Sequence, residues 1–232
     1  MGPHEPTNRV KGPAVPQGAL DAQQPHWETV FSQKPEMLGE SPSDPARWAA
    51  ALFRQGDAAR LLELGCGQGR DTLFFVRSGF QVTAVDYSQV AVETILSKSR
   101  AVAGTASVAA LRHDLREPLP FPDASFDGCY CHMLFCMAFT TPQLERLFRE
   151  VRRVLKPGAP SIYTVRHTRD PWYGTGIHRG EDLYEVNGFI VHFFNREKVE
   201  HLAKGYTIVS VDEFEEGELP RRLFRVTLRK EP

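Results

Sequence analysis

The stretch from Arg60 to Asp71, RLLELGCGQGRD, combines an acidic residue with closely spaced glycines. Glu63 interrupts an apolar run, and Gly65, Gly67 and Gly69 follow at alternate positions. Glycine tolerates positive φ and lets another group come close to the backbone. The stretch therefore predicts a loop on which a flat or polar ligand rests against the main chain.

The glycine spacing differs from that of a dinucleotide-binding loop. Such loops carry G-x-G-x-x-G, in which the third glycine lets the helix open against the sheet. This chain has G-x-G-x-G, and Arg70 stands where that third glycine belongs. A carboxylate at Glu63 would also repel a pyrophosphate, whereas it would attract an amino group or a cation. The loop therefore argues against a nicotinamide cofactor.

Acidic residues also follow the next two apolar runs. Asp86 ends QVTAVD, where a carboxylate can accept both hydroxyls of a ribose. Asp114, in His113-Asp114-Leu115, can accept a hydrogen bond from an exocyclic amine such as that of adenine. Ligands of open α/β sheets bind beyond the carboxyl ends of the strands, so these groups would meet at one edge. An amine, a ribose and an adenine together indicate S-adenosylmethionine.

Five segments in succession resemble the motifs of class I S-adenosylmethionine-dependent methyltransferases. They are LLELGCGQGRD, VTAVDYS, RHDL, SFDGCYCHMLF and EVRRVLKPG, and the resemblance covers roughly residues 45–165. It implies that the glycines wrap the methionine part and that Asp86 holds the ribose. It further implies that Asp114 and Leu115 bracket the adenine. The cofactor-binding residues implied are Glu63, Gly65, Cys66, Gly67, Gly69, Arg70, Asp71, Asp86, Tyr87, Ser88, His113, Asp114, Leu115, Cys131 and His132.

The pattern of apolar runs predicts the α/β elements that position these residues. The expected strands are residues 61–64, 81–86, 107–111, 126–132, 161–165, 207–214 and 223–228, and the expected helices are 44–55 (with Asp44 as N-cap), 70–78, 88–102 (closed by Gly104), 142–155 and 197–204. Alternating strands and helices imply a parallel sheet, and the short turn between the last two strands makes them antiparallel. We expect a Rossmann-like, seven-stranded, mostly parallel sheet with one reversed edge strand and helices on both faces.

Composition sets the expected domain organisation and location. Residues 1–24 are poor in large apolar groups and predict a disordered tail, followed by a single domain over 25–232. Within this domain, residues 25–43 would form an amino-terminal cap and residues 168–193 would form a lid. The lid is expected to be irregular at least to residue 190. A net charge of −1 attracts neither nucleic acid nor an anionic membrane. No signal peptide or membrane-spanning run is present, and four cysteines without zinc-like pairing predict a cytoplasmic protein without a metal site.

The segment after the fourth expected strand bears on the methyl acceptor. Methyltransferases acting on amino groups of DNA or RNA resemble one another in an acid-or-asparagine, Pro-Pro-aromatic loop there, and this chain has CHMLF instead. We therefore expect a small-molecule acceptor with a sulfur, selenium, tellurium, arsenic, oxygen or nitrogen nucleophile. The cap and lid loosely resemble tellurite-resistance and thiopurine methyltransferases. The expected substrate pocket comprises Trp27, Phe31, His167, Trp172, Tyr173, His178, Arg179 and Tyr184, although these side chains could instead only pack the lid onto the body.

Several alternatives stay open at the level of the sequence. His132 could be a general base or only a cofactor contact, with His167 and His178 as other bases. Cys129, Cys131 and Cys136 could bind a soft acceptor such as arsenic(III), or be buried core residues. The protein could also be a non-catalytic S-adenosylmethionine-binding module or partner subunit, or a nicotinamide dehydrogenase. The sequence does not determine the oligomeric state.

Overall fold

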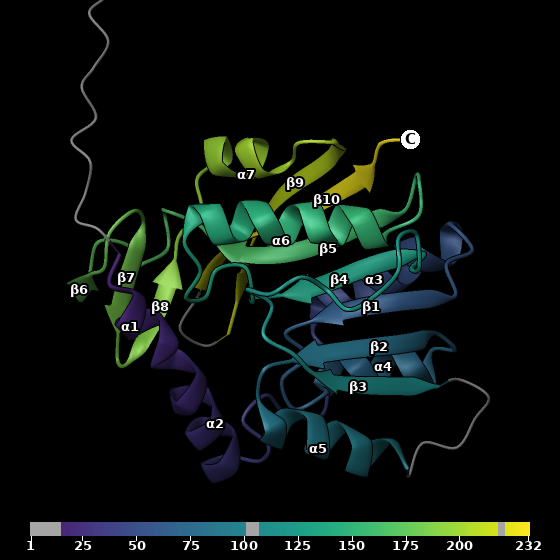
Figure 1. The fold of residues 1–232 in the computed structure, drawn as a ribbon, viewed down its shortest axis with the longest axis horizontal. Coiled ribbons are helices and arrows are strands. Elements are labelled where there is room, and N and C mark those ends of the chain that lie inside the picture. The colour runs from purple at the N-terminus through teal and green to yellow at the C-terminus, as the bar shows by residue number, and fades with distance from the viewer. Residues whose placement is uncertain (1–14, 101–106, 218–220) are drawn as a thin grey trace, which may run out of the picture.

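The computed structural model describes residues 15–100, 107–217 and 221–232, and its centre is a seven-stranded sheet (Figure 1). The strand order is β3-β2-β1-β4-β5-β10-β9. The first five of these strands run parallel, and β10 pairs antiparallel with both β5 and β9. The strands are β1 (Arg60–Leu64), β2 (Gln81–Asp86), β3 (Val108–Arg112), β4 (Gly128–His132), β5 (Pro160–Arg166), β9 (Tyr206–Glu216) and β10 (Arg221–Lys230). The expected fold class is confirmed.

Helices cover both faces of this sheet, because alternate residues of its strands are apolar on opposite sides. On one face, Leu62 and Tyr163 pack in one core with α6 (Thr141–Val154) and α7 (Arg196–Leu202). On the other face, Leu61 and Ile162 pack with α3 (Asp44–Gln55), α4 (Arg70–Arg77) and α5 (Gln89–Ser99). Strands β1 and β4 therefore lie in the middle of a three-layered body, and their carboxyl ends open at one edge.

Side-chain caps define where the helices begin. The Ser43 hydroxyl accepts a hydrogen bond from the Ala46 amide at 3.1 Å, so Ser43 caps α3, and the expected cap Asp44 is instead the first helical residue. Thr140 and Gln143 form a reciprocal capping box at the start of α6. Helix α5 ends at Ser99, and the expected closing residue Gly104 lies outside the described residues.

The amino-terminal segment is helical where the sequence predicts a disordered tail. Residues 1–14 lie outside the described part, but α1 (Gln17–Asp21) and α2 (Gln23–Gln33) include the rest of the expected tail and the first part of the expected cap. Leu20 is 3% exposed because it packs against Leu183 and Ile190 of the lid. This polar segment is ordered by contacts with a distant part of the chain, which local composition does not reveal.

Residues 168–176 of the lid are irregular, as expected, but the rest of the lid forms a small sheet that the sequence did not predict. It contains β6 (Ile177–His178), β7 (Leu183–Val186) and β8 (Phe189–His192), all antiparallel, and lies beside α1 and α2 at one end of the molecule (Figure 1). Asn187 and Gly188 connect β7 to β8, and both have positive φ, as a two-residue hairpin turn requires. No helix among the described residues is long and apolar enough to cross a membrane.

Candidate active site

A cavity of about 300 Å³ lies at the carboxyl ends of β1 to β4, between the sheet, α2 and the lid. Of the residues expected to bind the cofactor, Gly69, Ser88 and Cys131 do not line it. Those that do are Glu63, Gly65, Cys66, Gly67, Arg70, Asp71, Asp86, Tyr87, His113, Asp114, Leu115 and His132. The fold therefore brings most of the expected cofactor residues to one space.

The glycine loop between β1 and α4 needs glycine at each position. Gly65, Gly67 and Gly69 have φ of 70°, 49° and 83°. A Cβ at Gly65 would lie 2.7 Å from the Leu134 Cβ, and one at Gly69 would lie 2.5 Å from the Ile95 Cγ1. Gly69 therefore serves the packing of α4 against α5, and its neighbours Gly65 and Gly67 form the cavity wall.

Glu63 is a buried carboxyl group at the end of β1. It is 3% exposed, and its Oε2 has no hydrogen-bond partner among the described residues. Burial, together with the negative charge of Asp71, raises the pKa of Glu63 to about 8. A lone buried carboxyl facing a cavity is costly unless a partner arrives, so this group favours a ligand that carries an amino group or a cation.

Asp86 fixes the glycine loop from the end of β2. Its Oδ2 accepts a hydrogen bond from the Gly67 amide at 2.9 Å, and its Oδ1 accepts one from the Ser88 amide at 3.0 Å. Burial raises its pKa above the usual value. Ser88 itself is buried and caps α5 by accepting from the Ala91 amide, so it does not reach the cavity.

Asp114 already has a partner at the end of β3. Arg116 donates to both of its oxygens, at 2.6 to 3.0 Å, and a second arm of Arg116 pairs with Asp21 of α1. Burial raises the pKa of Asp114, but the hydrogen bonds from Arg116 outweigh it and leave the pKa low. His113, next to it, keeps a buried Nε2 without a partner in the described chain. A ligand at this end of the cavity would meet His113 and the Asp114–Arg116 pair.

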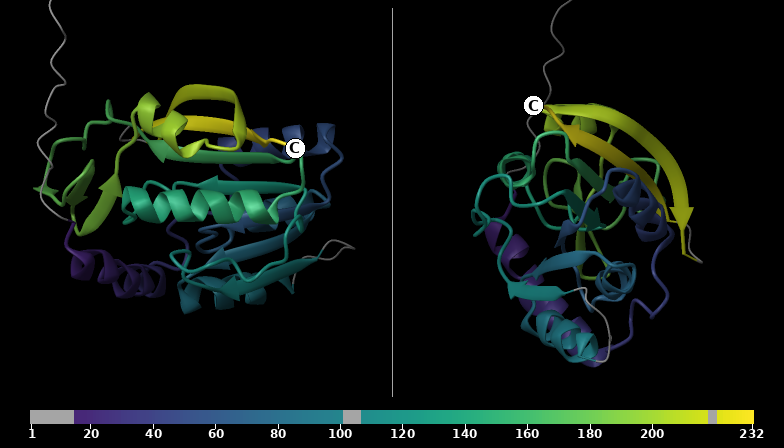
Figure 2. Two further views of the ribbon diagram at one scale, coloured as in Figure 1. Left: turned by 45° about the horizontal axis from the view of Figure 1, so that its top comes forward. Right: turned by 90° about the vertical axis from the view of Figure 1, so that its right-hand side faces the viewer.

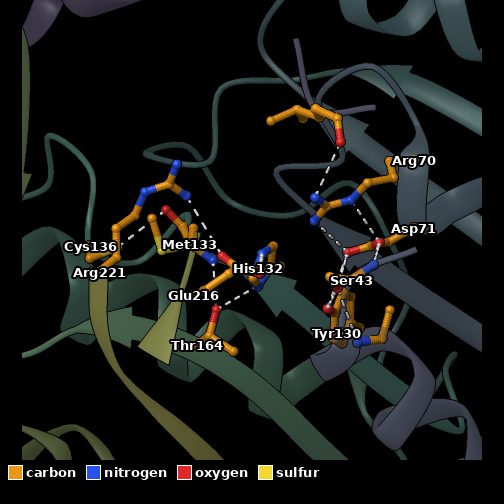
Figure 3. A network of polar contacts seen from close by, with 12 residues as sticks. Ser43, Arg70, Asp71, Tyr130, His132, Met133, Cys136, Thr164, Glu216 and Arg221 are labelled. Carbon is orange, nitrogen blue, oxygen red and sulfur yellow. Dashed lines mark hydrogen bonds and ion pairs between the residues drawn. The ribbon is translucent and has the colours of Figure 1, made fainter. Parts of the chain in front are cut away.

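His132 is held from two sides at the end of β4 (Figure 3). Its Nδ1 lies 2.8 Å from the Thr164 hydroxyl, and its Nε2 lies 3.4 Å from Oε1 of Glu216. The Met133 amide donates to the same hydroxyl at 3.0 Å, so the Thr164 side chain holds both the His132 ring and the backbone of the next residue.

Glu216 belongs to the β9–β10 hairpin, which bends around the edge of the sheet (Figure 2). Burial works to raise its pKa, but hydrogen bonding to His132 and the charges of Arg70 and Arg221 outweigh it, so the pKa lies below its usual value. Arg221 lies 3.7 Å from the other carboxylate oxygen. Sequence reasoning missed Glu216 and Arg221, because no motif marks them and only the bend of the hairpin brings them to the cavity.

Asp71 binds Ser43, the residue that caps the start of α3 (Figure 3). It accepts hydrogen bonds from the Ser43 amide at 2.8 Å, the Ser43 hydroxyl at 2.7 Å and the Tyr130 hydroxyl at 3.2 Å, and it pairs with Arg70 at 3.1 Å. Burial raises its pKa, but Arg70 and these donors bring it below the usual value. Asp71 is therefore an ionised group that positions the cavity wall.

The expected substrate residues fall into two sets. Trp27, Phe31 and Trp172 line the cavity. The remaining five lie elsewhere and are not part of the proposed site: His167 is buried against Phe224 beside a separate groove, Tyr184 packs between Tyr173 and His178 on the lid, and Arg179 pairs with Glu185. His178 and Tyr184 are paired residues of β6 and β7, and neither lines the cavity.

The four cysteines fall into two groups, one that lines the cavity and three in the core. Cys66 lines the cavity, whereas Cys129, Cys131 and Cys136 are at most 1% exposed in the core and do not. Burial raises the pKa of each of these three thiols, to about 11 for Cys136 and about 12 for Cys129. Within the described ranges, no group of three or more His, Cys, Asp or Glu side chains could hold a metal ion. The structure therefore fits the alternative in which these three cysteines are buried core residues. Cys131, which was expected to contact the cofactor, lies in the core and does not line the cavity.

Further residues line the cavity that were not among the site residues expected from the sequence. Gln23 holds the start of β8 and the turn before it through both ends of its amide, donating to the Gly188 carbonyl at 3.0 Å and accepting from the Ile190 amide at 3.1 Å. The other lining residues that the sequence did not reveal are Leu20, Gln24, Met37, Leu38, Arg116, Met133, Leu134, Met137, Ala138, Phe139, Arg166, Phe189, Val191, Glu216 and Arg221. Most are apolar, so the part of the cavity away from the glycine loop favours a largely apolar ligand.

Comparisons with known proteins agree with this architecture. Residues 61–158 match a family model described as a methyltransferase domain. The chain is 36% identical over 112 residues to the malonyl-[acyl-carrier protein] O-methyltransferase of Erwinia pyrifoliae, covering 48% of this chain and 39% of that protein. It is 30% identical over 165 residues to the 24-methylenesterol C-methyltransferase 2 of Oryza sativa, covering 69% and 43% respectively. The chain thus spans less than half the length of these curated relatives.

A solved structure resembles the whole chain. It is the 1,6-didemethyltoxoflavin-N1-methyltransferase of Burkholderia thailandensis, with bound 1,6-didemethyltoxoflavin and S-adenosylhomocysteine. The two share 18% sequence identity with a TM-score of 0.74, and the match covers 100% of both chains. At this identity the likeness shows the fold. Residues 61–158 are thus similar to a methyltransferase domain, and the chain shares its fold with a solved methyltransferase.

Proposed function

We propose that this protein transfers a methyl group from S-adenosylmethionine to a small organic acceptor. The observation that carries the proposal is the buried Glu63 carboxyl beside the glycine loop, with an Oε2 unpartnered within the described chain. In the proposed complex Glu63 meets the amino group of the methionine part, Asp86 the ribose, and His113 with Leu115 the adenine. The sulfonium supplies an already activated methyl group, so the protein mainly has to hold donor and acceptor in line.

The place of His132 supports a role at the transfer step. Leu64 of β1 pairs with Cys131 of β4. The residues that follow them, Gly65 and His132, therefore lie side by side at the carboxyl ends of two neighbouring strands. When the acceptor is an N–H or O–H group, its lone pair attacks the methyl carbon while the C–S electrons pass to sulfur. The released proton is proposed to go to the Glu216 carboxylate, which lies 3.4 Å from the Nε2 of His132.

The acceptor is proposed to be small because α2 and the lid enclose the cavity with aromatic residues. Two of the three relatives named above are a 24-methylenesterol C-methyltransferase and a 1,6-didemethyltoxoflavin-N1-methyltransferase, whose names give small organic acceptors. The name of the third gives a malonyl group on an acyl-carrier protein. A closer kinship with the tellurite-resistance and thiopurine enzymes rests only on this aromatic cap. All four cysteines are free thiols, which favours a reducing, cytoplasmic location, and we treat the cap and lid as parts of one domain with the sheet.

Calorimetry and a labelled-methyl assay test the proposal. We expect micromolar binding of S-adenosylhomocysteine, no binding of NADH, and transfer of label to at least one acceptor in a panel of phenols, N–H heterocycles, amines, thiols, selenite, tellurite and arsenite. Tight cofactor binding without any transfer would favour the non-catalytic binding module. Binding of NADH in place of S-adenosylhomocysteine would contradict the proposal.

A further inference from the structure

Arg166 ends β5 on the side of the cavity away from the glycine loop. Strand order β1-β4-β5 places it two strands from the loop, about 10 Å at the usual strand spacing. It shares a strand face with Thr164, which contacts His132. A ligand atom beside Arg166 would therefore lie beyond His132 as seen from the proposed cofactor, where the acceptor belongs.

The guanidinium of Arg166 is held rigidly. Its Nε and Nη2 donate to Asp170 at 3.0 and 2.5 Å, and both side chains are almost wholly buried. Asp170 also accepts from the backbone amides of Trp172 and Arg222, each at 2.9 Å. Trp172 lies under the guanidinium, with 4.3 Å between the Arg166 Cζ and the ring centre. This stack fixes the direction in which the remaining Arg166 hydrogens point.

The hydrogen bonds of the Arg166 guanidinium to Asp170 use Nε and Nη2, which leaves Nη1 available on a side chain that lines the cavity. A hydrogen bond from a charged donor is stronger than one between neutral groups, so Nη1 favours an oxygen atom supplied by the cavity's occupant. Planar side chains and thioethers surround the same space, from Trp172, Phe139, Phe189, Met133 and Met137. These surfaces favour a flat ring.

The charges of the groups around Arg166 indicate which kind of ligand oxygen its Nη1 would bind. Asp170 already neutralises Arg166, and the cavity's other arginines also have carboxylate partners: Arg70 with Asp71, Arg116 with Asp114, and Arg221 with Glu216. A carboxylate ligand would lose its hydration free energy on entering the cavity, and no arginine with an unbalanced positive charge is there to compensate for it. An uncharged carbonyl loses much less hydration free energy. We propose that Arg166 is an acceptor-recognition residue, whose Nη1 donates to a neutral carbonyl oxygen on a planar heteroaromatic methyl acceptor.

This inference rests on the proposed function only in assigning the space to the methyl acceptor. Binding to the complex with S-adenosylhomocysteine tests it, with 2-quinolinone, quinoline (the same bicycle without the oxygen) and 2-naphthoate as probes. Fluorescence reports on them, because Trp27 and Trp172 line the cavity while Trp48 stacks with Arg225 elsewhere. We expect 2-quinolinone to bind at least tenfold tighter than quinoline, as one hydrogen bond to a charged donor provides, and tighter than 2-naphthoate.

Arg166→Lys keeps the charge beside Asp170 but removes the planar fork, so it should reduce the preference for 2-quinolinone over quinoline to twofold or less. Arg179→Lys, on the lid outside the cavity, is the matched control and should keep the tenfold preference. Should Arg166→Lys fail to fold, the infrared carbonyl stretch of ¹³C-labelled 2-quinolinone bound to the unaltered protein decides the point, and we expect it below its value in an apolar solvent.

Three results would overturn the inference. They are equal binding or no binding of 2-quinolinone and quinoline, tighter binding of 2-naphthoate, and an unshifted carbonyl stretch. Calorimetry with S-adenosylhomocysteine is run on the same samples. Cofactor binding that persists in any of these cases leaves the proposed function standing, whereas its loss would overturn both.

Discussion

The Nε2 of His132 and the Oε1 of Glu216 lie 3.4 Å apart, although β4 and β9 are separated in the sheet by β5 and β10. The bend of the β9–β10 hairpin closes this gap and adds a carboxylate to a wall otherwise built from strand ends. Asp71, Arg70 and Arg221 are the other charged groups that act on the pair. The contact joins the final hairpin to the proposed transfer site, and its loss should affect both stability and catalysis.

Glu216→Gln should make the protein less sensitive to acid. The pKa of Glu216 is lower in the folded protein, so the ionised group stabilises the fold above its unfolded value of roughly 4.3, and this contribution is lost as the pH falls through the folded value. Urea unfolding between pH 3 and 7 should show a smaller acid loss in the variant. Glu215→Gln, whose exposed carboxylate pairs with Arg222, should behave like the unaltered protein. Identical acid profiles for Glu216→Gln and the unaltered protein would contradict this reading.

The same variant should slow methyl transfer to an N–H or O–H acceptor by about 100-fold, the usual contribution of a positioned proton acceptor. Binding of S-adenosylhomocysteine should stay within about twofold. Transfer to a thiolate, which has no proton to lose, should fall much less. A uniform loss with all acceptors would instead show that Glu216 only holds the hairpin in place.

Binding of S-adenosylhomocysteine should release a proton from Glu63. The pKa of this buried carboxyl is about 8, so it is largely protonated at pH 6.5 and must ionise to pair with the ligand's ammonium group. Calorimetry in buffers of different ionisation enthalpy should show release of nearly one proton at pH 6.5, declining between pH 7 and 9. Glu63→Gln should abolish the release and weaken binding by about tenfold or more. Equal proton release by the variant would assign the proton to another group.

Two glycine substitutions separate backbone strain from crowding. Gly69 and Gly79 both have positive φ, but a Cβ would meet Ile95 at 2.5 Å in the first case and nothing within 4 Å in the second. Gly79→Ala should cost about 1–2 kcal/mol of unfolding free energy, and Gly69→Ala about 2–4 kcal/mol, because crowding adds to the strain. Denaturant unfolding measures both. Equal costs would mean that α5 moves freely away from the loop.

Ser43→Ala should destabilise the protein by about 2–3 kcal/mol. The hydroxyl caps α3 and also donates to the buried carboxylate of Asp71, so the change removes a cap and a hydrogen bond to a charged group. Thr140→Ala removes the cap of α6 without touching a buried carboxylate and should cost about 1 kcal/mol. Thermal unfolding of the two variants tests the difference. An effect of Ser43→Ala no larger than that of Thr140→Ala would show that Asp71 finds another partner.

The sequence by itself predicted the sheet, its mixed edge and the loop at its centre. Those features follow from local rules, such as apolar runs of strand length, glycines that permit positive φ, and acids at strand ends. Glu63 and Asp86 lie at the carboxyl ends of β1 and β2, and Asp114 follows the end of β3 by two residues. Their meeting at one cavity follows from the parallel arrangement alone.

Only the tertiary structure decided the rest of the site. Leu20 and Gln23 order a polar segment by contacting the lid, Arg166 acquires its rigid stack from Asp170 and Trp172, and Glu216 reaches His132 through a bent hairpin. His178 and Tyr184, which the sequence favoured, are paired residues of β6 and β7 and do not line the cavity. Contacts between residues far apart in the chain leave no local pattern, since they depend on how whole elements pack.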